Sequence, residues 1–401
     1  MSRILLAWEL GAGLGHLGPF FDFVPQLLER GHELHIAARE IVGACRVMGD
    51  LPVAVHQAPL CLNTYSGLQE PPLNYAEILM RYGYLDAAML RAMLAAWDSL
   101  LRATQAELVI ADHVPTALLA ARLLGIPCAV IGSPFAVPPA KHPTPNMRAW
   151  LDVPAARLMD SDTRVLATIN AALPAGAPQV TALHQIFDQA AQFFMGLPET
   201  DCYGPRECPV YLGLKVPGTG TAMPAWPEGP GKRVFTYMHA DYPHLDTVVR
   251  ALASSGARVI SYVGTDKKLL QCFQVPGMNP VTELVDMRKV LAEADLCVTH
   301  GMGTTLAAVG AGVALLMLPK QLENYLFAFA LQQAGVGITV HPDEAGPDIE
   351  GVLGRLFRDD AYARNAHGLA ERYREPSVGT IAAQVVARIE ALAGSPQEKH
   401  A

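Results

Sequence analysis

Two residues in separate loops of the N-terminal half have side chains suited to proton transfer. His16 follows the apolar, strand-like run 4–8, and Asp112 directly follows the run 109–111. An imidazole accepts a proton near neutral pH, so His16 is a candidate general base. A carboxylate at the end of a strand in the same sheet can hold the imidazole tautomer and stabilise its protonated form, which makes Asp112 the candidate partner. The alternatives are a packing role for His16 and a helix-capping role for Asp112.

A third loop, residues 299–306, follows the apolar run 295–298 and precedes an Ala-rich, helix-like segment. Its two glycines let the backbone approach a ligand closely, and Thr304 or Thr305 can cap the helix. The start of such a helix offers unpaired N–H groups and a positive dipole end to an anion. The pattern therefore predicts a phosphate site, with an ordinary tight turn as the alternative.

Glu323 and Asn324 lie just after the strand-like run 313–318, where a further helix is expected to begin. Adjacent acid and amide groups suit the hydroxyls of a sugar, because each group accepts or donates hydrogen bonds in a fixed geometry. A polyol ligand is the resulting hypothesis. The alternative is that Glu323 is a first-turn residue stabilised by the helix dipole.

Alternating strands and helices are expected to position the loops of the N-terminal half. We expect strands at 4–8, 33–37, 107–111 and 126–131, and helices at 20–30, 115–124 and 179–194. Strand, helix and strand in succession predict parallel pairing with right-handed crossovers. The N-terminal half is therefore predicted to be a doubly wound α/β sheet.

A second alternating series follows the stretch 211–230, which is rich in proline and glycine and lacks periodicity. We expect strands at 233–237, 258–263, 296–299 and 313–318, and helices at 245–254, 285–292, 323–333, 348–357, 360–374 and 377–393. The predicted domains are residues 1–215 and 231–375, joined by a linker at 216–230, with a final segment 376–401 that can pack back on the first domain. Two such domains leave a cleft facing the carboxyl ends of both sheets, where ligands of such sheets bind.

Residues 63–104 are irregular at first and then helical, and they include Tyr75, Tyr82 and Met89. These side chains offer a large and adaptable apolar surface that is suited to an apolar ligand. The alternative is ordinary core packing between helices. The proline-rich stretch 134–145 is expected to be a rim or lid loop, or a general surface loop.

The composition excludes several classes of protein. The chain of 401 residues has a formal net charge of −8 and no basic cluster, which argues against a nucleic-acid partner. Its seven cysteines are scattered without a Cys-x-x-Cys arrangement, which indicates a reducing cytoplasm and no structural zinc. The first residues lack the pattern of a signal peptide, and the uncharged run 296–319 is interrupted by glycines and threonines, so no membrane span is expected.

Taken in order along nearly the whole chain, these motifs resemble the glycosyltransferases of family 1, which include macrolide and flavonoid enzymes. The motifs are Gly15-His16-x-x-Pro19, Arg30-Gly31-His32-Glu33-Leu34, Ala111-Asp112, Leu124-Gly125-Ile126-Pro127, His300-Gly301 to Gly312, and Leu318-Pro319-Lys320-Gln321-Leu322-Glu323. The resemblance implies the GT-B fold, with an acceptor-binding N-terminal domain and a nucleotide-sugar-binding C-terminal domain. A Pro- and Gly-rich linker near 217–231 would then serve as a closing hinge.

By position, the resemblance implies that His16 deprotonates the acceptor hydroxyl and that Asp112 supports His16. It also implies a donor site made of His300, Gly301, Gly303, Thr304 and Thr305 for the pyrophosphate, and of Glu323 and Asn324 for the sugar. The reaction would be an inverting displacement without a metal or further cofactor, from a UDP- or dTDP-sugar to a hydrophobic small molecule that Tyr75, Tyr82 and Met89 help to bind.

The chain departs from the family pattern at the donor loop. The segment from His300 to Gly303 is one residue shorter than usual, and Ala307 with Ala308 stands where the family usually carries a glutamate that binds the ribose. Two alternatives therefore accompany the transferase hypothesis. One is a catalytically inactive binding or helper protein of the same fold, and the other is a nucleotide-sugar epimerase.

Overall fold

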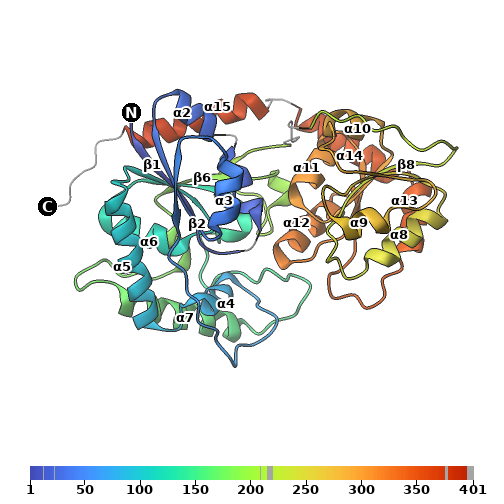
Figure 1. Ribbon diagram of the computed structural model, residues 1–401. Helices are drawn as coiled ribbons and strands as arrows, with labels where there is room; N and C mark the ends of the chain where they lie inside the picture. Colours follow the sequence, from blue (N-terminus) through green and yellow to red (C-terminus); the bar gives the residue numbers. More distant parts are fainter. Residues whose placement is uncertain (12, 22, 208, 215–219, 375–377, 395–401) are drawn as a thin grey trace. The chain divides into compact units, whose positions relative to one another are not determined.

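The computed structural model describes residues 1–401 except 12, 22, 208, 215–219, 375–377 and 395–401 (Figure 1). Its contacts divide the chain into two compact units. The N-terminal unit comprises Met1–Met195, Arg206–Leu212 and Gly379–Ala401, and the C-terminal unit comprises Gly196–Pro205 and Gly213–Val378. The predicted linker and hinge lie partly outside the described residues, at 215–219.

The N-terminal unit is built on a seven-stranded parallel sheet in the order β3-β2-β1-β4-β5-β6-β7. The strands are β1 (Arg3–Trp8), β2 (Glu33–Ala38), β3 (Val53–Gln57), β4 (Leu108–Asp112), β5 (Cys128–Gly132), β6 (Ala190–Phe194) and β7 (Val210–Tyr211). The strand order reverses at β1 and β4, which lie side by side. The carboxyl ends of two such strands form the edge at which doubly wound sheets bind ligands.

Helices flank this sheet, and the last helix of the chain is one of them (Figure 1). They are α1 (Gly18–Phe21), α2 (Val24–Glu29), α3 (Ile41–Met48), α4 (Tyr75–Leu79), α5 (Ala87–Ala103), α6 (Pro115–Leu124), α7 (Ala155–Ala172) and α15 (Val378–Ala393), with 3-10 turns η1 (Leu14–His16), η2 (Met80–Tyr82), η3 (Pro134–Ala136) and η4 (Leu183–Ile186). Val385 and Ile389 of α15 are fully buried in the same core as Ile4 of β1. The C-terminal helix therefore completes the first core.

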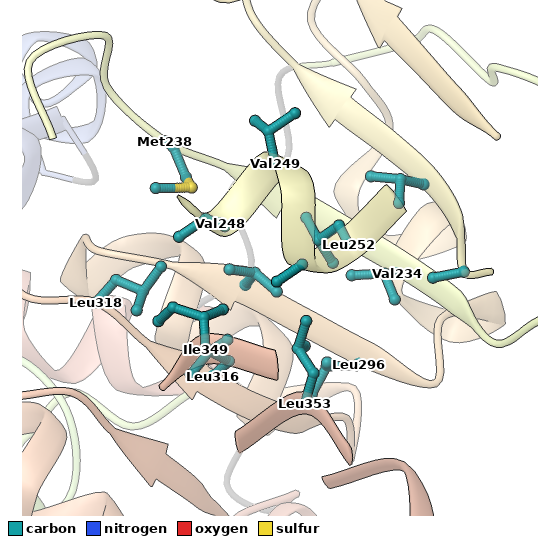
Figure 2. Packing of buried hydrophobic residues seen from close by; sticks show 14 of the residues in the cluster. Val234, Met238, Val248, Val249, Leu252, Leu296, Leu316, Leu318, Ile349 and Leu353 are labelled. Atoms are coloured by element: carbon teal, nitrogen blue, oxygen red, sulfur yellow. The ribbon is translucent and has the colours of Figure 1, made fainter. Parts of the chain in front are cut away.

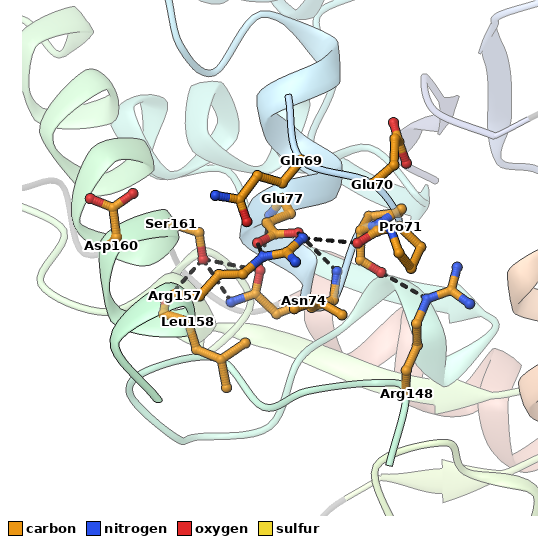
Figure 3. Close-up of polar contacts among 12 residues, drawn as sticks. Gln69, Glu70, Pro71, Asn74, Glu77, Arg148, Arg157, Leu158, Asp160 and Ser161 are labelled. Carbon is orange, nitrogen blue, oxygen red and sulfur yellow. Dashed lines mark hydrogen bonds and ion pairs between the residues drawn. The ribbon is translucent and has the colours of Figure 1, made fainter. Parts of the chain in front are cut away.

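The irregular segment before α4 is fixed by polar contacts with α7 (Figure 3). Asn74 caps α4 by accepting a hydrogen bond from the Glu77 amide, and its side-chain amide donates to the Ser161 hydroxyl over 3.0 Å. Arg157 donates to both carboxylate oxygens of Glu77 over 2.7 Å. Such paired charge-assisted bonds hold a helix end in a defined place.

The C-terminal unit contains a second parallel sheet, with six strands in the order β10-β9-β8-β11-β12-β13. The strands are β8 (Arg233–Tyr237), β9 (Arg258–Tyr262), β10 (Met278–Val281), β11 (Leu296–Thr299), β12 (Ala314–Met317) and β13 (Gly337–Thr339). The helices are α8 (Leu245–Ser254), α9 (Lys267–Cys272), α10 (Met287–Glu293), α11 (Met302–Gly310), α12 (Leu322–Gln333), α13 (Ile349–Arg358) and α14 (Ala361–Arg372), with the 3-10 turn η5 (Pro198–Thr200).

Each face of the second sheet has its own core. On one face, Leu252 of α8 and Leu353 of α13 pack over Leu296 and Leu316 of the central strands (Figure 2). On the other face, residues of α10, α11, α12 and α14 form a second buried cluster. Since burial of each large apolar side chain contributes about 2 kcal/mol, these two cores hold β11 and the loop after it in place.

The α/β fold with two doubly wound parallel sheets is confirmed, but the predicted helix at 179–194 is wrong. That segment contains the short turn η4 and then strand β6, which pairs with β5 and buries Phe193 and Phe194. The aromatic residues at its end favour a strand, and the parallel neighbour provides the pairing that a sequence window does not reveal. The predicted helix at 20–30 is divided into α1 and α2.

Candidate functional site

His16 and Asp112 form a hydrogen-bonded pair at the carboxyl end of the first sheet. The imidazole Nδ1 lies 3.0 Å from the Asp112 carboxylate Oδ2. Both side chains are sheltered from solvent, with exposed fractions of 11% for His16 and 4% for Asp112. The two residues are 96 positions apart in the chain, and the parallel pairing of β1 with β4 brings them together.

Strand register and ring stacking set the position of this pair. Trp8, the last residue of β1, is the register partner of Asp112, the last residue of β4. The His16 imidazole stacks on the Trp8 indole with ring centroids 5.3 Å apart and an interplanar angle of 20°. The indole is itself held by its N–H, which donates to the Leu10 carbonyl over 2.8 Å. The stacking on Trp8 therefore fixes the plane of the imidazole, and the hydrogen bond with Asp112 fixes its rotation within that plane.

Two glycines make room for the pair. A Cβ atom at Gly11 would stand 2.2 Å from His16 Nε2, and a Cβ atom at Gly132 would stand 2.3 Å from Asp112 Oδ1. Gly11 also has a φ of +84°, a backbone conformation that favours glycine. A larger residue at either place would displace the imidazole or the carboxylate.

The burial of Asp112 raises its pKa, and the neighbouring His16 lowers it in opposition. Burial is the larger effect, so the pKa of Asp112 is raised overall, and His16 is the neighbour that favours its charged form. Asp112 does not serve as the N-cap of α6, because that position is taken by Val114. The capping alternative for Asp112 is thus wrong.

In the C-terminal unit, the predicted phosphate loop lies between β11 and α11. Gly301 occupies the N-cap position, and α11 begins at Met302. The prediction that Thr304 or Thr305 caps the helix is wrong, because both lie within the first turn and the Thr305 hydroxyl donates back to the Gly301 carbonyl over 2.8 Å. With glycine at the cap, the first-turn amides keep their capacity to bind an anion.

His300 lies at the start of this loop among other rings. Its imidazole is 4.1 Å from that of His239 and 5.7 Å from the Tyr237 phenol, measured between ring centroids. Burial lowers the pKa of His300 to about 4, and the neighbouring His239 and Lys320 act in the same direction. His300 is therefore uncharged at neutral pH, and its buried Nδ1 has no hydrogen-bond partner among the described residues.

A small hollow of about 10 Å³ lies beside His300. Four of the predicted donor residues line it: His300, Gly301, Thr305 and Asn324. Gly303 and Thr304 lie in the first turn of α11, and Glu323 lies in the first turn of α12, outside this lining. The structure thus brings Asn324 of α12 together with the loop after β11.

Ala307 and Ala308 are completely buried on α11 and belong to the apolar core of the C-terminal unit. These positions contribute only methyl groups to packing. A carboxylate that binds ribose hydroxyls is therefore not supplied by these two residues.

The three predicted acceptor residues differ in exposure. Tyr75 is completely buried at the start of α4, whereas Tyr82 and Met89 are half-buried. Tyr75 lies beside His113, which follows Asp112, with ring centroids 5.9 Å apart. Of the three, Tyr75 is thus the residue whose ring lies beside a sequence neighbour of Asp112.

Sequence reasoning missed several residues of both sites. They are Gly11, Gly132, Glu9 and His113 near the first pair, and His239 near His300. Glu9 and His239 each lie shortly after a strand, which is the signal that could have identified them. Within the part of the chain that the structure describes, no group of His, Cys, Asp and Glu side chains could hold a metal ion, and no helix could cross a membrane.

Comparison with known proteins finds similarity to a known family in the C-terminal part of the chain. Residues 247–392 match the family described as "Erythromycin biosynthesis protein CIII-like, C-terminal domain". The NDP-glycosyltransferase YjiC of Bacillus subtilis (strain 168) is 30% identical over 126 residues, which are 31% of this chain and 28% of the relative. The elloramycin glycosyltransferase ElmGT of Streptomyces olivaceus is 33% identical over 114 residues, which are 28% of each chain. The chain thus matches less than a third of the length of these curated relatives.

Solved structures resemble the fold over nearly the whole chain. The calicheamicin glycosyltransferase CalG4 has a TM-score of 0.66 at 21% identity, with 98% of both chains covered. The glycosyltransferase VinC, solved in complex with dTDP, has a TM-score of 0.65 at 18% identity, covering 98% of this chain and 99% of its own. The spinosyn rhamnosyltransferase SpnG, complexed with spinosyn aglycone, has a TM-score of 0.64 at 19% identity, covering 96% and 100%. These likenesses show the two-sheet fold.

Proposed function

We propose that this chain is an inverting glycosyltransferase of the macrolide type in family 1, with the GT-B fold. It moves a sugar from a nucleoside diphosphate to a hydroxyl of a hydrophobic small molecule. The observation that carries the proposal is the sheltered hydrogen bond of 3.0 Å between His16 and Asp112. An acid bonded to one imidazole nitrogen orients the other nitrogen for proton transfer.

In the proposed reaction, His16 Nε2 takes the proton of the acceptor hydroxyl. The acceptor oxygen forms a bond to the anomeric carbon of the donor, while the bond from that carbon to the phosphate oxygen breaks and the nucleoside diphosphate leaves with its electron pair. Attack from the side opposite the leaving group inverts the configuration. The proton stays on the imidazolium, which the Asp112 carboxylate stabilises.

The C-terminal unit would bind the donor. The first-turn amides and the dipole of α11 favour an anion at the start of this helix. The diphosphate of the donor is the proposed anion. His300, Gly301 and Thr305 would contact it, and Asn324 together with Glu323 would contact the sugar hydroxyls. The donor would be a UDP- or dTDP-sugar, and dTDP is the ligand named for the VinC structure. The proposed reaction needs no metal or further cofactor, because helix amides can stabilise the leaving diphosphate.

The proposed surroundings are a reducing cytoplasm, which the scattered cysteines without a Cys-x-x-Cys arrangement fit. The partners would be the nucleotide sugar and the acceptor alone. The net charge of −8 supports the expectation that nucleic acid is not a partner.

A panel of nucleotides tests the function directly. The purified protein is heated alone and with UDP, dTDP, GDP and their sugars, and its unfolding temperature is measured. Binding to the folded state raises that temperature, so at least one diphosphate should give a clear shift. Transfer to an acceptor panel is then measured by mass spectrometry with the donor that binds. The absence of any shift across the panel would contradict the proposed function.

A second candidate is a binding or helper protein of the same fold without transferase activity. The observation that favours it is the burial of Ala307 and Ala308 in the core, which leaves this part of α11 without a ribose ligand. Under this hypothesis a nucleotide would bind weakly or not at all, and no sugar would be transferred to any acceptor. The thermal-shift panel and the transfer assay therefore separate the two candidates.

A further inference from the structure

His113 bears three energetic costs at one position. Its backbone adopts a φ of +47°, a left-handed conformation that is unfavourable for a side chain of this size. Its imidazole is only 6% exposed, and Nε2 has no hydrogen-bond partner among the described residues. Burial of an unpaired polar atom reduces stability, so each such atom in a native protein calls for an explanation.

Tyr75 presents a second unpaired polar atom beside it. Its ring lies 5.9 Å from the His113 ring between centroids, and its hydroxyl is buried without a partner in the described structure. Tyr75 is completely buried, and it is the first residue of α4, whose N-cap Asn74 is bonded to Ser161 of α7 (Figure 3). The hydroxyl is therefore held in place by the surrounding structure.

The neighbourhood of this pair is the proposed acceptor site. The His113 ring lies 6.2 Å from the His16 ring, and on another side Phe135 meets it edge to face at 6.1 Å. The backbone of His113 is fixed because its carbonyl accepts a hydrogen bond from the Leu10 amide over 2.9 Å. Burial lowers the pKa of His113 to about 3, so its imidazole is neutral and able to donate or accept a hydrogen bond.

We propose that His113 Nε2 and the Tyr75 hydroxyl bind a second oxygen of the acceptor, a hydroxyl or carbonyl close to the hydroxyl that His16 deprotonates. The inference rests on the proposed function, because it takes His16 as the group that faces the acceptor. Both atoms gain a partner only when such an acceptor is bound, which explains why their cost is retained in the free protein. Acceptors with two nearby oxygens would be favoured over those with one.

The comparison of Tyr75 with Tyr84 provides a matched control. Both phenols are completely buried, but the Tyr84 hydroxyl bonds to the Thr116 hydroxyl over 2.8 Å. Tyr84→Phe removes a satisfied bond and should lower the unfolding temperature by roughly 2 °C, whereas Tyr75→Phe removes an unsatisfied hydroxyl and should leave that temperature equal or higher. If Tyr75→Phe lowers the temperature as much as Tyr84→Phe, the hydroxyl has a structural partner such as an ordered water, and the proposal is overturned.

Binding of two probes tests the ligand chemistry. The probes are 1-naphthol and 1,3-dihydroxynaphthalene, which differ by one hydroxyl on the next but one ring carbon. Without nucleotide sugar, calorimetry should give about tenfold tighter binding of the diol to the unmodified protein and to Tyr84→Phe. Tyr75→Phe and His113→Asn, the latter chosen because asparagine tolerates the left-handed backbone, should lose this preference.

Equal behaviour of the two probes with the unmodified protein, or a preference that survives in both site variants, would overturn the inference. The measurement needs no transfer reaction. A protein that fails to bind nucleotides would therefore contradict the proposed function while the probe preference still decides the role of His113 and Tyr75.

Discussion

The two histidines that follow strands in the two sheets have opposite surroundings. His16 has a carboxylate 3.0 Å from its Nδ1, whereas His300 has the His239 imidazole at 4.1 Å between ring centroids and is further influenced by Lys320. The first environment stabilises a positive imidazolium, and the second keeps the imidazole neutral, with its pKa lowered to about 4. Under the proposed function, a histidine near a central strand of each sheet thus serves a different task, proton transfer in one unit and anion contact in the other.

Replacement of Asp112 is expected to have the largest effect among the variants that leave His16 in place. Asp112→Asn keeps the shape of the side chain but removes the charge that stabilises the imidazolium, and it can favour the wrong tautomer. Transfer should fall by about 10³-fold with nucleotide affinity unchanged. Steady-state kinetics and calorimetry with the nucleoside diphosphate check both quantities. Asp188→Asn, on an exposed turn beside His184, is a control that should retain activity.

The glycines beside the pair should give the next largest effect. At Gly132, an added Cβ would stand 2.3 Å from the Asp112 carboxylate, so Gly132→Ala must shift that group. Transfer should fall by about 100-fold, because displacements near 1 Å can cost that much in a positioned reaction. Gly368→Ala, on α14, is the control, since a Cβ there has open space around it. Equal kinetics of Gly132→Ala and the unmodified protein would mean that the position of Asp112 is not critical.

Variants of His300 should affect nucleotide binding and not proton transfer. His300→Ala removes a hydrogen-bonding group and should weaken nucleoside diphosphate binding by about tenfold. His300→Gln keeps a neutral group of similar reach, so it should retain most of the affinity if the imidazole acts uncharged. Equal losses in Ala and Gln variants at neutral pH would instead indicate a cationic role. His367→Gln, on an exposed part of α14, should bind nucleotide normally.

The smallest expected effect concerns stability and the buried acid Glu9. Burial raises the pKa of Glu9 to about 8, although the Thr116 hydroxyl and amide both donate to its carboxylate. The folded protein therefore retains a proton that the unfolded chain loses near pH 4.5. This contribution to stability is complete at low pH and is lost as the pH rises through about 8.

Between pH 6.5 and 8, the free energy of unfolding should fall by up to about 1.4 kcal/mol per pH unit because of Glu9. His113 and His300, whose pKa values are lowered to about 3 and about 4, oppose this slope near pH 6.5, where their imidazoles are still partly protonated in the unfolded chain, and contribute little by pH 8. Glu9→Gln should flatten the curve obtained by denaturant titration. An unchanged slope in the variant would show that Glu9 does not titrate in this range.

Much of the fold followed from the sequence, since local patterns set many of its elements. The helices Pro115–Leu124 and Leu245–Ser254 were predicted with their observed bounds, because an N-terminal proline or a strong apolar face defines them. Strand β6 was missed because its identity depends on pairing with β5. That strand lies 58 or more residues earlier in the chain, and the two meet only in the folded structure.

The candidate site shows the same division. His16 and Asp112 could be paired in advance because both follow strands, and parallel strands place their carboxyl ends at one edge. Gly11 and Gly132 could not be recognised, because their importance lies in the space that a Cβ would occupy in three dimensions. The cap of α11 was assigned to a threonine on propensity, whereas the loop geometry places Gly301 there.

The most direct test of the roles proposed for His16 and His300 is to replace His16 alone and to measure both sugar transfer and nucleotide binding. His16→Ala is compared with the unmodified protein for sugar transfer and, by calorimetry, for binding of the nucleoside diphosphate that the thermal-shift panel identifies. We expect a loss of transfer of about 10³-fold or more with nucleotide affinity unchanged within twofold. Transfer at the normal rate, or loss of transfer together with nucleotide affinity, would contradict the assignment of His16 as the base.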